Sequence, residues 1–285
     1  MTPLLEVVVY VYIPKPDRRE RDTWGYVCME ETKKRTLEWR KIPVQGVKFR
    51  RIFILQMKES HRFYRIKFDE LLTQLRAKVL PQSPLDALFF SCNHADVERL
   101  LENLHKECYF KSIIAKGSSN YMPEMIMEFV EDQAKLGTLE ELDLSGAWPR
   151  SITKALEGVL MQKQFNHLRT SFDDSTRLLD ELFVTKFLNA WCRIRKPELN
   201  LCLEIHSPAL VGKIGGLVHK IKKRDGFIVR VGCRHPTSAA CVFAYARESK
   251  PEMLLFFVQD DIRSVGNDEI VEELNKTEPW SNMTR

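Results

Sequence analysis

Cys92-Asn93-His94 places a thiol next to an imidazole. A cysteine nucleophile needs a histidine base close in space and a third group that orients the base. Side chains of adjacent residues rarely face each other productively, and Asn93 also fits a repeat motif described below. A buried core thiol is the better interpretation of Cys92. We therefore predict no catalytic residues, and an enzyme of unknown class is the third functional alternative.

The other histidines and cysteines form no pattern that would hold a metal or a cofactor. The seven cysteines are scattered and never form C-x-x-C, whereas zinc sites and disulfide frameworks need clustering. The sequence also lacks H-E-x-x-H, G-x-S-x-G and a phosphate-binding loop. We expect buried, reduced cysteines, no metal site and no cofactor.

Positive charge is concentrated near the N-terminus. Residues 15–67 hold 16 Lys and Arg against 7 Asp and Glu, a net of +9, while the whole chain carries +5. Within 63–68, basic residues alternate with aromatic and apolar ones, which is typical of some RNA-binding sheets. The other interpretation is a solvated strand whose Lys and Arg protect a sheet edge. With no recognised RNA-binding motif present, nucleic-acid binding through 15–67 is the second functional hypothesis, after binding of a protein partner.

The elements that must position these side chains recur at a near-constant spacing. Leu139, Leu142 and Leu144 match the L-x-x-L-x-L core of a leucine-rich repeat. Related segments begin at residues 85, 110 and 165, so successive starts are 25, 29 and 26 residues apart. Repeat strands are predicted near residues 88, 113, 142, 168, 201 and 229. Helical spacing of apolar residues predicts helices between them, starting near Asp96, Pro123, Ser151, Ser175 and Ser207. Ser151 and Ser175 are predicted N-caps, and the last helix is predicted to reach Ile221.

This alternation predicts an α/β fold, a divergent leucine-rich-repeat-like solenoid with parallel strands on one side and helices on the other. Residues 1–84 are interpreted as a small β-rich N-terminal module, bounded by Pro81 and Pro84, and residues 85–285 as the repeat domain. The module's third strand, 47–55, breaks its alternation at Arg50-Arg51, which predicts a bulge or an edge. Three closely spaced strands from about residue 226 predict a β-meander that caps the solenoid.

Strand positions between the buried ones point away from the predicted helices, and they supply the candidate binding residues. Apolar side chains beside charges on such a face are typical of a peptide-binding surface. The alternative is that the N-terminal module covers the two apolar positions, 89 and 114. The predicted protein-binding residues are Phe89, Ile114, Lys116, Glu141, Asp143 and Arg169.

Two parts of the chain resemble a known group of sequences. The first is Asp22-Thr23-Trp24-Gly25-Tyr26. The second is Leu142–Pro149, which precedes a predicted helix and Lys163-Gln164-Phe165. The chain resembles, over about residues 20–205, an uncharacterised nematode family similar to F-box-associated and FTH domains with divergent leucine-rich repeats. The resemblance implies substrate recognition in a cullin-RING ubiquitin ligase. An F-box has three helices in about fifty residues, whereas this chain begins with a predicted strand at 5–13. Docking to a cullin-RING adaptor is therefore doubtful, and no binding residue carries over.

The sequence as a whole predicts a non-catalytic protein–protein interaction scaffold, related to the substrate-recognition part of F-box ubiquitin ligases. Its protein partner is not identified by the sequence. No stretch approaches the roughly 18 uncharged apolar residues that a membrane span needs, and no basic leader precedes the first strand. We expect no membrane segment and an intracellular location, cytoplasmic or nuclear.

Overall fold

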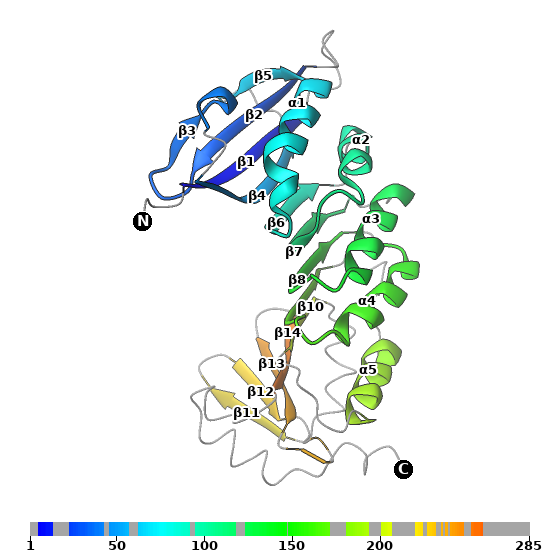
Figure 1. Ribbon diagram of the computed structural model, residues 1–285. Coiled ribbons are helices and arrows are strands. Elements are labelled where there is room, and N and C mark those ends of the chain that lie inside the picture. Colours follow the sequence, from blue (N-terminus) through cyan, green and yellow to red (C-terminus); the bar gives the residue numbers. More distant parts are fainter. Residues whose placement is uncertain are drawn as a thin grey trace. The chain divides into compact units, whose positions relative to one another are not determined.

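The chain divides into two compact units, Met1–Leu139 and Glu140–Arg285, in the computed structural model (Figure 1). The structure describes residues 5–13, 23–42, 46–56, 62–91, 95–117, 123–146, 148–171, 181–193, 201–206, 220–224, 227–231, 235, 237–238, 240–247 and 252–258.

The sheet of the first unit combines parallel strands with an antiparallel N-terminal edge. Its described strands are β1 (Leu5–Ile13), β2 (Thr23–Glu30), β3 (Arg35–Leu37), β4 (Val47–Gln56), β5 (Tyr64–Lys67), β6 (Leu85–Ser91) and β7 (Phe110–Lys116). Their order is β7-β6-β4-β1-β2-β3, and β5 also pairs with β2. Strands β1, β4, β6 and β7 run parallel to one another. Strand β2 is antiparallel to β1, β3 and β5.

Helices cover one face of these strands (Figure 1). They are α1 (Phe68–Gln74), which continues as a π-helical turn (Leu75–Val79) and a 3-10 turn (Leu80–Gln82), α2 (Ala95–Leu104) and α3 (Glu124–Lys135); another 3-10 turn spans Trp39–Lys41. Apolar residues at helical spacing give each helix one buried stripe. In α3 that stripe includes Phe129, whose ring lies 6.3 Å from the rings of both Phe90 and Phe110.

Aligned apolar residues form the core beneath the helices. The strand register places Val9 beside Ile52, Ile52 beside Leu88, and Leu88 beside Ile113. All four side chains are fully buried. Successive side chains of a strand point to opposite faces, so the residues that follow each of these four point away from the helices.

A buried glutamine ties α3 to the start of β7. The Gln133 side-chain oxygen accepts a hydrogen bond from the Phe110 N–H at 3.2 Å, and its amide donates to the Cys108 carbonyl at 2.8 Å. Because Gln133 is fully buried, both backbone groups would lose their partner without it.

The second unit has parallel strands followed by an antiparallel meander. Its described elements are β8 (Glu141–Ser145), a 3-10 turn (Arg150–Ile152), α4 (Thr153–Leu160), β9 (His167–Ser171), α5 (Glu181–Arg193), β10 (Leu201–His206), β11 (Lys220–Arg224), β12 (Phe227–Val231), β13 (Cys241–Arg247) and β14 (Glu252–Val258). The order is β8-β9-β10-β14-β13-β12-β11. Strands β8, β9 and β10 are parallel, and the remaining neighbours are antiparallel.

The core of the second unit repeats the scheme of the first. Leu142 lies beside Leu168, and both are buried together with Leu156 and Val159 of α4. His235 anchors the segment before β13 to α5. The Thr237 N–H donates to its Nδ1 at 3.3 Å, so Nε2 carries the proton and donates to the Trp191 carbonyl at 3.1 Å.

The predicted mixed α/β architecture with mostly parallel strands is confirmed, and so is the meander. The bulge predicted at Arg50-Arg51 is also confirmed, because the register against β1 passes from Val7–Phe49 to Val8–Arg51 and leaves Arg50 as the extra residue. The sequence predicts a domain boundary at residue 84. Strand β4, before that position, pairs with β6, after it.

Three predictions about local structure are wrong. The strand near 229 does not continue the parallel series, because β12 pairs antiparallel with β11 and β13, and β14 takes the place beside β10. Ser151 does not cap α4, since a 3-10 turn precedes it and Ile152 is the N-cap residue. The helix predicted to reach Ile221 gives way to β11. Asp225-Gly226, a strong hairpin signal, lies in sequence between β11 and β12 and outweighs the helical pattern.

The helix starts predicted at Ser175 and Ser207 lie outside the described residues. Across the ranges given above, every helix is too short or too polar to cross a membrane.

Candidate functional site

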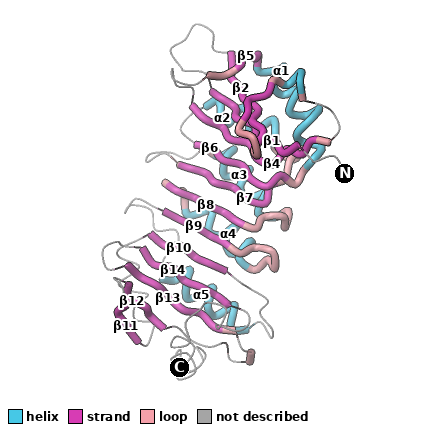
Figure 2. Tube along the Cα trace, turned by 90° about the vertical axis from the view of Figure 1, so that its left-hand side faces the viewer, coloured by secondary structure: helices cyan, strands magenta, loops and turns pink. Residues whose placement is uncertain are grey.

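The strand face opposite the helices carries a row of aligned apolar side chains in the first unit. The register pairs Tyr10 with Val27 on β2 and with Phe53 on β4. It then pairs Phe53 with Phe89, and Phe89 with Ile114. We call Val27, Tyr10, Phe53, Phe89 and Ile114 the aromatic row. Figure 2 shows β1, β4, β6 and β7 from this side, with α2 and α3 behind them.

The rings of the row pack against one another from strand to strand. The Tyr10 and Phe53 centroids are 5.0 Å apart with an angle of 17° between the ring planes. The Phe53 and Phe89 centroids are 5.7 Å apart at 36°. Nζ of Lys116 lies 5.2 Å from the centre of the Phe89 ring, within range of a cation–π contact. Ring faces are thus directed at neighbouring side chains.

One end of the row joins a closed apolar cluster and the other remains accessible. Val27 and Tyr12 are buried together against Leu55 and Phe63. Burial, with a smaller effect of Tyr10, raises the pKa of the Tyr12 hydroxyl. Gly25 is required here because a Cβ would lie 2.7 Å from the Phe63 ring. The other four members of the row are half-buried.

Ion pairs border the row on the side of the β4 bulge. Nε of Arg50 lies 2.8 Å from an Asp86 carboxylate oxygen and 3.7 Å from one of Glu6. Arg51 pairs with Glu31 at 3.5 Å. These charges therefore compensate one another, while Lys116 at the β7 end is exposed.

The predicted binding residues fall into two groups. Phe89, Ile114 and Lys116 are brought together on β6 and β7, and the N-terminal strand β4 flanks Phe89 through Phe53. In the second unit, Glu141 lies beside His167 and Asp143 beside Arg169. Nε of Arg169 is 3.9 Å from Oδ2 of Asp143, and the Arg169 side chain is 48% exposed. The second group is polar.

The cysteines considered as nucleophiles either lie outside the described residues or are buried in the core. Cys92, Asn93 and His94 are not among the described residues. Burial raises the pKa of the Cys108 thiol to about 12 and also raises that of Cys28, so both stay protonated near neutral pH. The searched part of the chain, the described residues, contains no group of three His, Cys, Asp or Glu side chains that could hold a metal.

Sequence reasoning missed a cavity of about 300 Å³ in the first unit. Tyr26 on β2, Trp39 after β3 and Tyr64 on β5 line it, together with Arg40, Glu70 and Gln74. The Tyr26 ring stacks on Trp39 with centroids 5.6 Å apart and is tilted against Tyr64 with centroids 5.3 Å apart. Burial raises the pKa of the Tyr26 hydroxyl, and a backbone hydrogen bond with Trp39 partly offsets this. Three aromatic residues so far apart in sequence leave no periodic signal.

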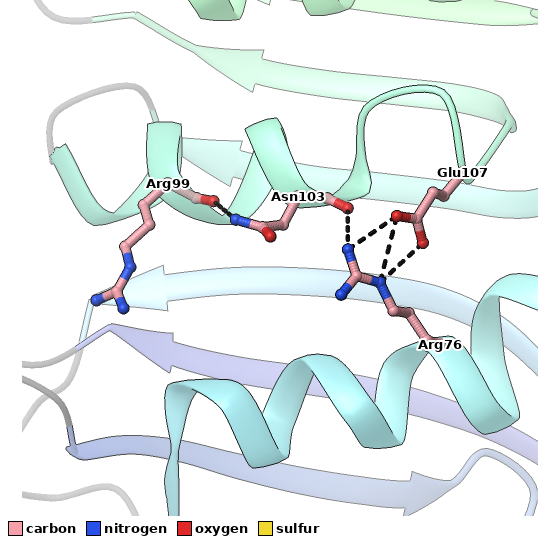
Figure 3. Close-up of polar contacts among 4 residues, drawn as sticks. All are labelled: Arg76, Arg99, Asn103 and Glu107. Atoms are coloured by element: carbon pink, nitrogen blue, oxygen red, sulfur yellow. Dashed lines mark hydrogen bonds and ion pairs between the residues drawn. The ribbon is translucent and has the colours of Figure 1, made fainter.

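A polar latch joins the π-helical turn to the end of α2 (Figure 3). The Arg76 guanidinium donates to the Glu107 carboxylate from Nε at 2.9 Å and from Nη2 at 2.8 Å. Glu107 raises the pKa of Arg76 through this hydrogen bond and through its charge. Arg99 of α2 lies 3.9 Å above the Phe68 ring of α1. The latch fixes α1 to α2 on the helix-covered side, away from the aromatic row.

Comparisons with protein-family models, with curated proteins and with solved structures found no match.

Proposed function

We propose that the chain is a non-catalytic protein-interaction scaffold that docks a partner protein on the aromatic row. The observation that carries this proposal is the continuous alignment of Tyr10, Phe53, Phe89 and Ile114 across four parallel strands. Half-buried apolar side chains on a helix-free face are available to a partner, and a few such anchors usually dominate binding energy.

The ring geometry favours a protein over a nucleic acid at this face. Bases bind aromatic platforms by stacking on free ring faces. Here the faces of Tyr10 and Phe53 meet each other, and Lys116 covers Phe89. Ring edges and the Ile114 side chain are left for contact, which suits apolar packing. RNA binding through residues 15–67 is the second candidate.

We further propose that the parallel strands descend from a divergent leucine-rich-repeat array related to the substrate-recognition part of F-box ubiquitin ligases. The aligned pairs Leu88–Ile113 and Leu142–Leu168 support the repeat interpretation. Their separations of 25 and 26 residues equal the spacing expected for such repeats. The link to ubiquitin ligases rests on sequence resemblance alone.

The test is affinity capture of interacting proteins with charge introduced into the row. Phe89→Glu and Ile114→Glu should each remove the same partner, because a carboxylate placed against an apolar partner surface loses its hydration. Leu136→Glu is the matched control, since Leu136 is 45% exposed in the same unit and lies outside the row. Circular dichroism and thermal unfolding establish that the variants fold.

Either of two results would contradict the proposal. One is a partner set that is unchanged in both row variants. The other is binding of generic RNA whose affinity falls steeply with salt, as phosphate contacts require, and which is lost on neutralising basic residues in 15–67.

A further inference from the structure

The cavity beside Trp39 lies where the outer edge of the first unit's sheet is interrupted. Strand β3 pairs with the Cys28–Glu30 end of β2, and β5 pairs with the Thr23–Tyr26 end. Among the described residues, Val27 therefore has no partner strand on this edge. The aromatic residues that line the cavity flank this interruption on β2, after β3 and at the start of β5.

Four charged residues line the cavity, Glu38, Arg40, Arg65 and Glu70, and two of opposite sign come from different elements without pairing. Arg40 comes from the 3-10 turn Trp39–Lys41, and Glu70 comes from α1. Both side chains are exposed, and the described part of the chain supplies neither with an ion-pair partner. By contrast, the nearby carboxylate of Glu38 is paired with Lys41 at 3.2 Å. Arg40 and Glu70 thus give the cavity wall a cation and an anion that no described residue pairs with.

We propose that this cavity binds a free α-amino acid with an apolar side chain. The α-carboxylate pairs with Arg40, the α-ammonium pairs with Glu70, and the side chain lies against Tyr26 and Tyr64. A volume of about 300 Å³ is at the small end of ligand pockets, so it suits a single amino acid better than a nucleotide. The proposal is independent of the aromatic row, which lies on the opposite face of the sheet.

Three probes distinguish a free amino acid from the end of a peptide. L-phenylalanine carries both charges, L-phenylalaninamide keeps only the ammonium as an N-terminal residue does, and N-acetyl-L-phenylalanine keeps only the carboxylate. Binding to the full chain is measured by isothermal titration calorimetry. The indole N–H resonance of Trp39, assigned from a Trp39→Phe spectrum, reports whether the ligand is in the cavity.

L-phenylalanine should bind about tenfold more tightly than either analogue, the loss expected for one charged contact. Arg40→Gln should abolish the preference over phenylalaninamide only, and Glu70→Gln should abolish the preference over N-acetylphenylalanine only. Both positions are exposed, so folding should persist. Asp69→Asn and Arg62→Gln are controls, because both residues are exposed nearby and neither lines the cavity.

Several results would overturn the assignment. They are absence of phenylalanine binding at millimolar concentration, equal binding of all three probes, or preferences that Arg40→Gln and Glu70→Gln leave intact. Tighter binding of one analogue would instead assign the cavity to a peptide terminus and reject a free amino acid.

Discussion

The helix-free strand faces of the two units differ in chemistry although the strands beneath them follow one scheme. In the first unit, Tyr10 stacks on Phe53, and Phe53 packs at a tilt against Phe89 on the neighbouring strand. In the second, Asp143 and Arg169 occupy the comparable outward positions of β8 and β9, and Nε of Arg169 lies 3.9 Å from Oδ2 of Asp143. Buried leucines lie behind both faces.

This difference separates the inward positions, which stabilise the fold, from the outward positions, which the proposed function uses. Inward residues are mostly apolar in both units, with the buried Thr170 of β9 an exception, because a parallel pair that carries helices needs a buried face. Outward residues are under no such requirement, so packing of the core does not explain why the outward residues of the first unit are apolar. We therefore propose that the first unit's face binds a partner and that the second unit's face is solvated.

The largest effect is expected from the inward positions, where the two units should behave alike. Leu88→Ala and Leu168→Ala should each lower the free energy of unfolding by about 2–5 kcal/mol, because each leaves a cavity in a packed core. Urea unfolding followed by circular dichroism measures the loss. A loss well under 1 kcal/mol for either leucine would break the assumed equivalence of the two cores.

A smaller effect is expected from the glutamine that joins α3 to β7. Gln133→Ala should cost about 1–3 kcal/mol, since the Phe110 N–H and the Cys108 carbonyl are left buried without partners. Faster hydrogen exchange at the Phe110 amide should accompany the loss. Exchange that is no faster than in the parent chain would show that the backbone groups find other partners.

The coupling energies measured in double-mutant cycles should differ between the outward faces of the two units. Tyr10 and Phe53 should couple by about 0.5–1.5 kcal/mol, the range for stacked aromatic pairs. Asp143 and Arg169 should couple by under about 0.5 kcal/mol, as exposed ion pairs do. The first coupling should persist at high salt and the second should vanish, because salt screens exposed charges. Equal couplings would remove the contrast between the faces.

The smallest effect concerns the helix-covered side of the first unit and appears only in acid. The pKa of Asp132 is lowered chiefly by a hydrogen bond from Lys135 and also by one with His105. A lowered folded-state pKa stabilises the chain above the unfolded value, 3.8, and this stability is lost as pH falls through the folded value. In the Asp132→Asn variant, the free energy of unfolding should therefore change less with pH below about 3.8. A variant profile with the parent's slope would assign the acid sensitivity to other carboxylates.

Local patterns predicted the inward residues well. The L-x-x-L-x-L spacing located β6, β7, β8 and β9, because burial of alternate side chains leaves a direct trace in sequence. The break at Arg50-Arg51 located the bulge for the same reason. Phe89 and Ile114 were predicted as outward residues from this alternation.

Features that depend on distant strands could not be predicted. Phe53 joins the row only because β4 pairs with β6, and nothing local to 47–56 indicates that partner. The cavity needs Tyr26, Trp39 and Tyr64 from three separate segments. The strand near 229 was assigned to the wrong neighbours because strand propensity does not specify pairing.

Site-specific photocrosslinking tests the central claim most directly. A photoreactive phenylalanine analogue replaces Ile114 in the aromatic row or, in separate chains, Arg169 or the exposed Met161 of the second unit. The account predicts a discrete protein adduct from position 114 that disappears when Phe89→Glu is added, and no such adduct from positions 161 and 169. An adduct from position 169 with none from 114, or one from 114 that survives Phe89→Glu, would contradict it.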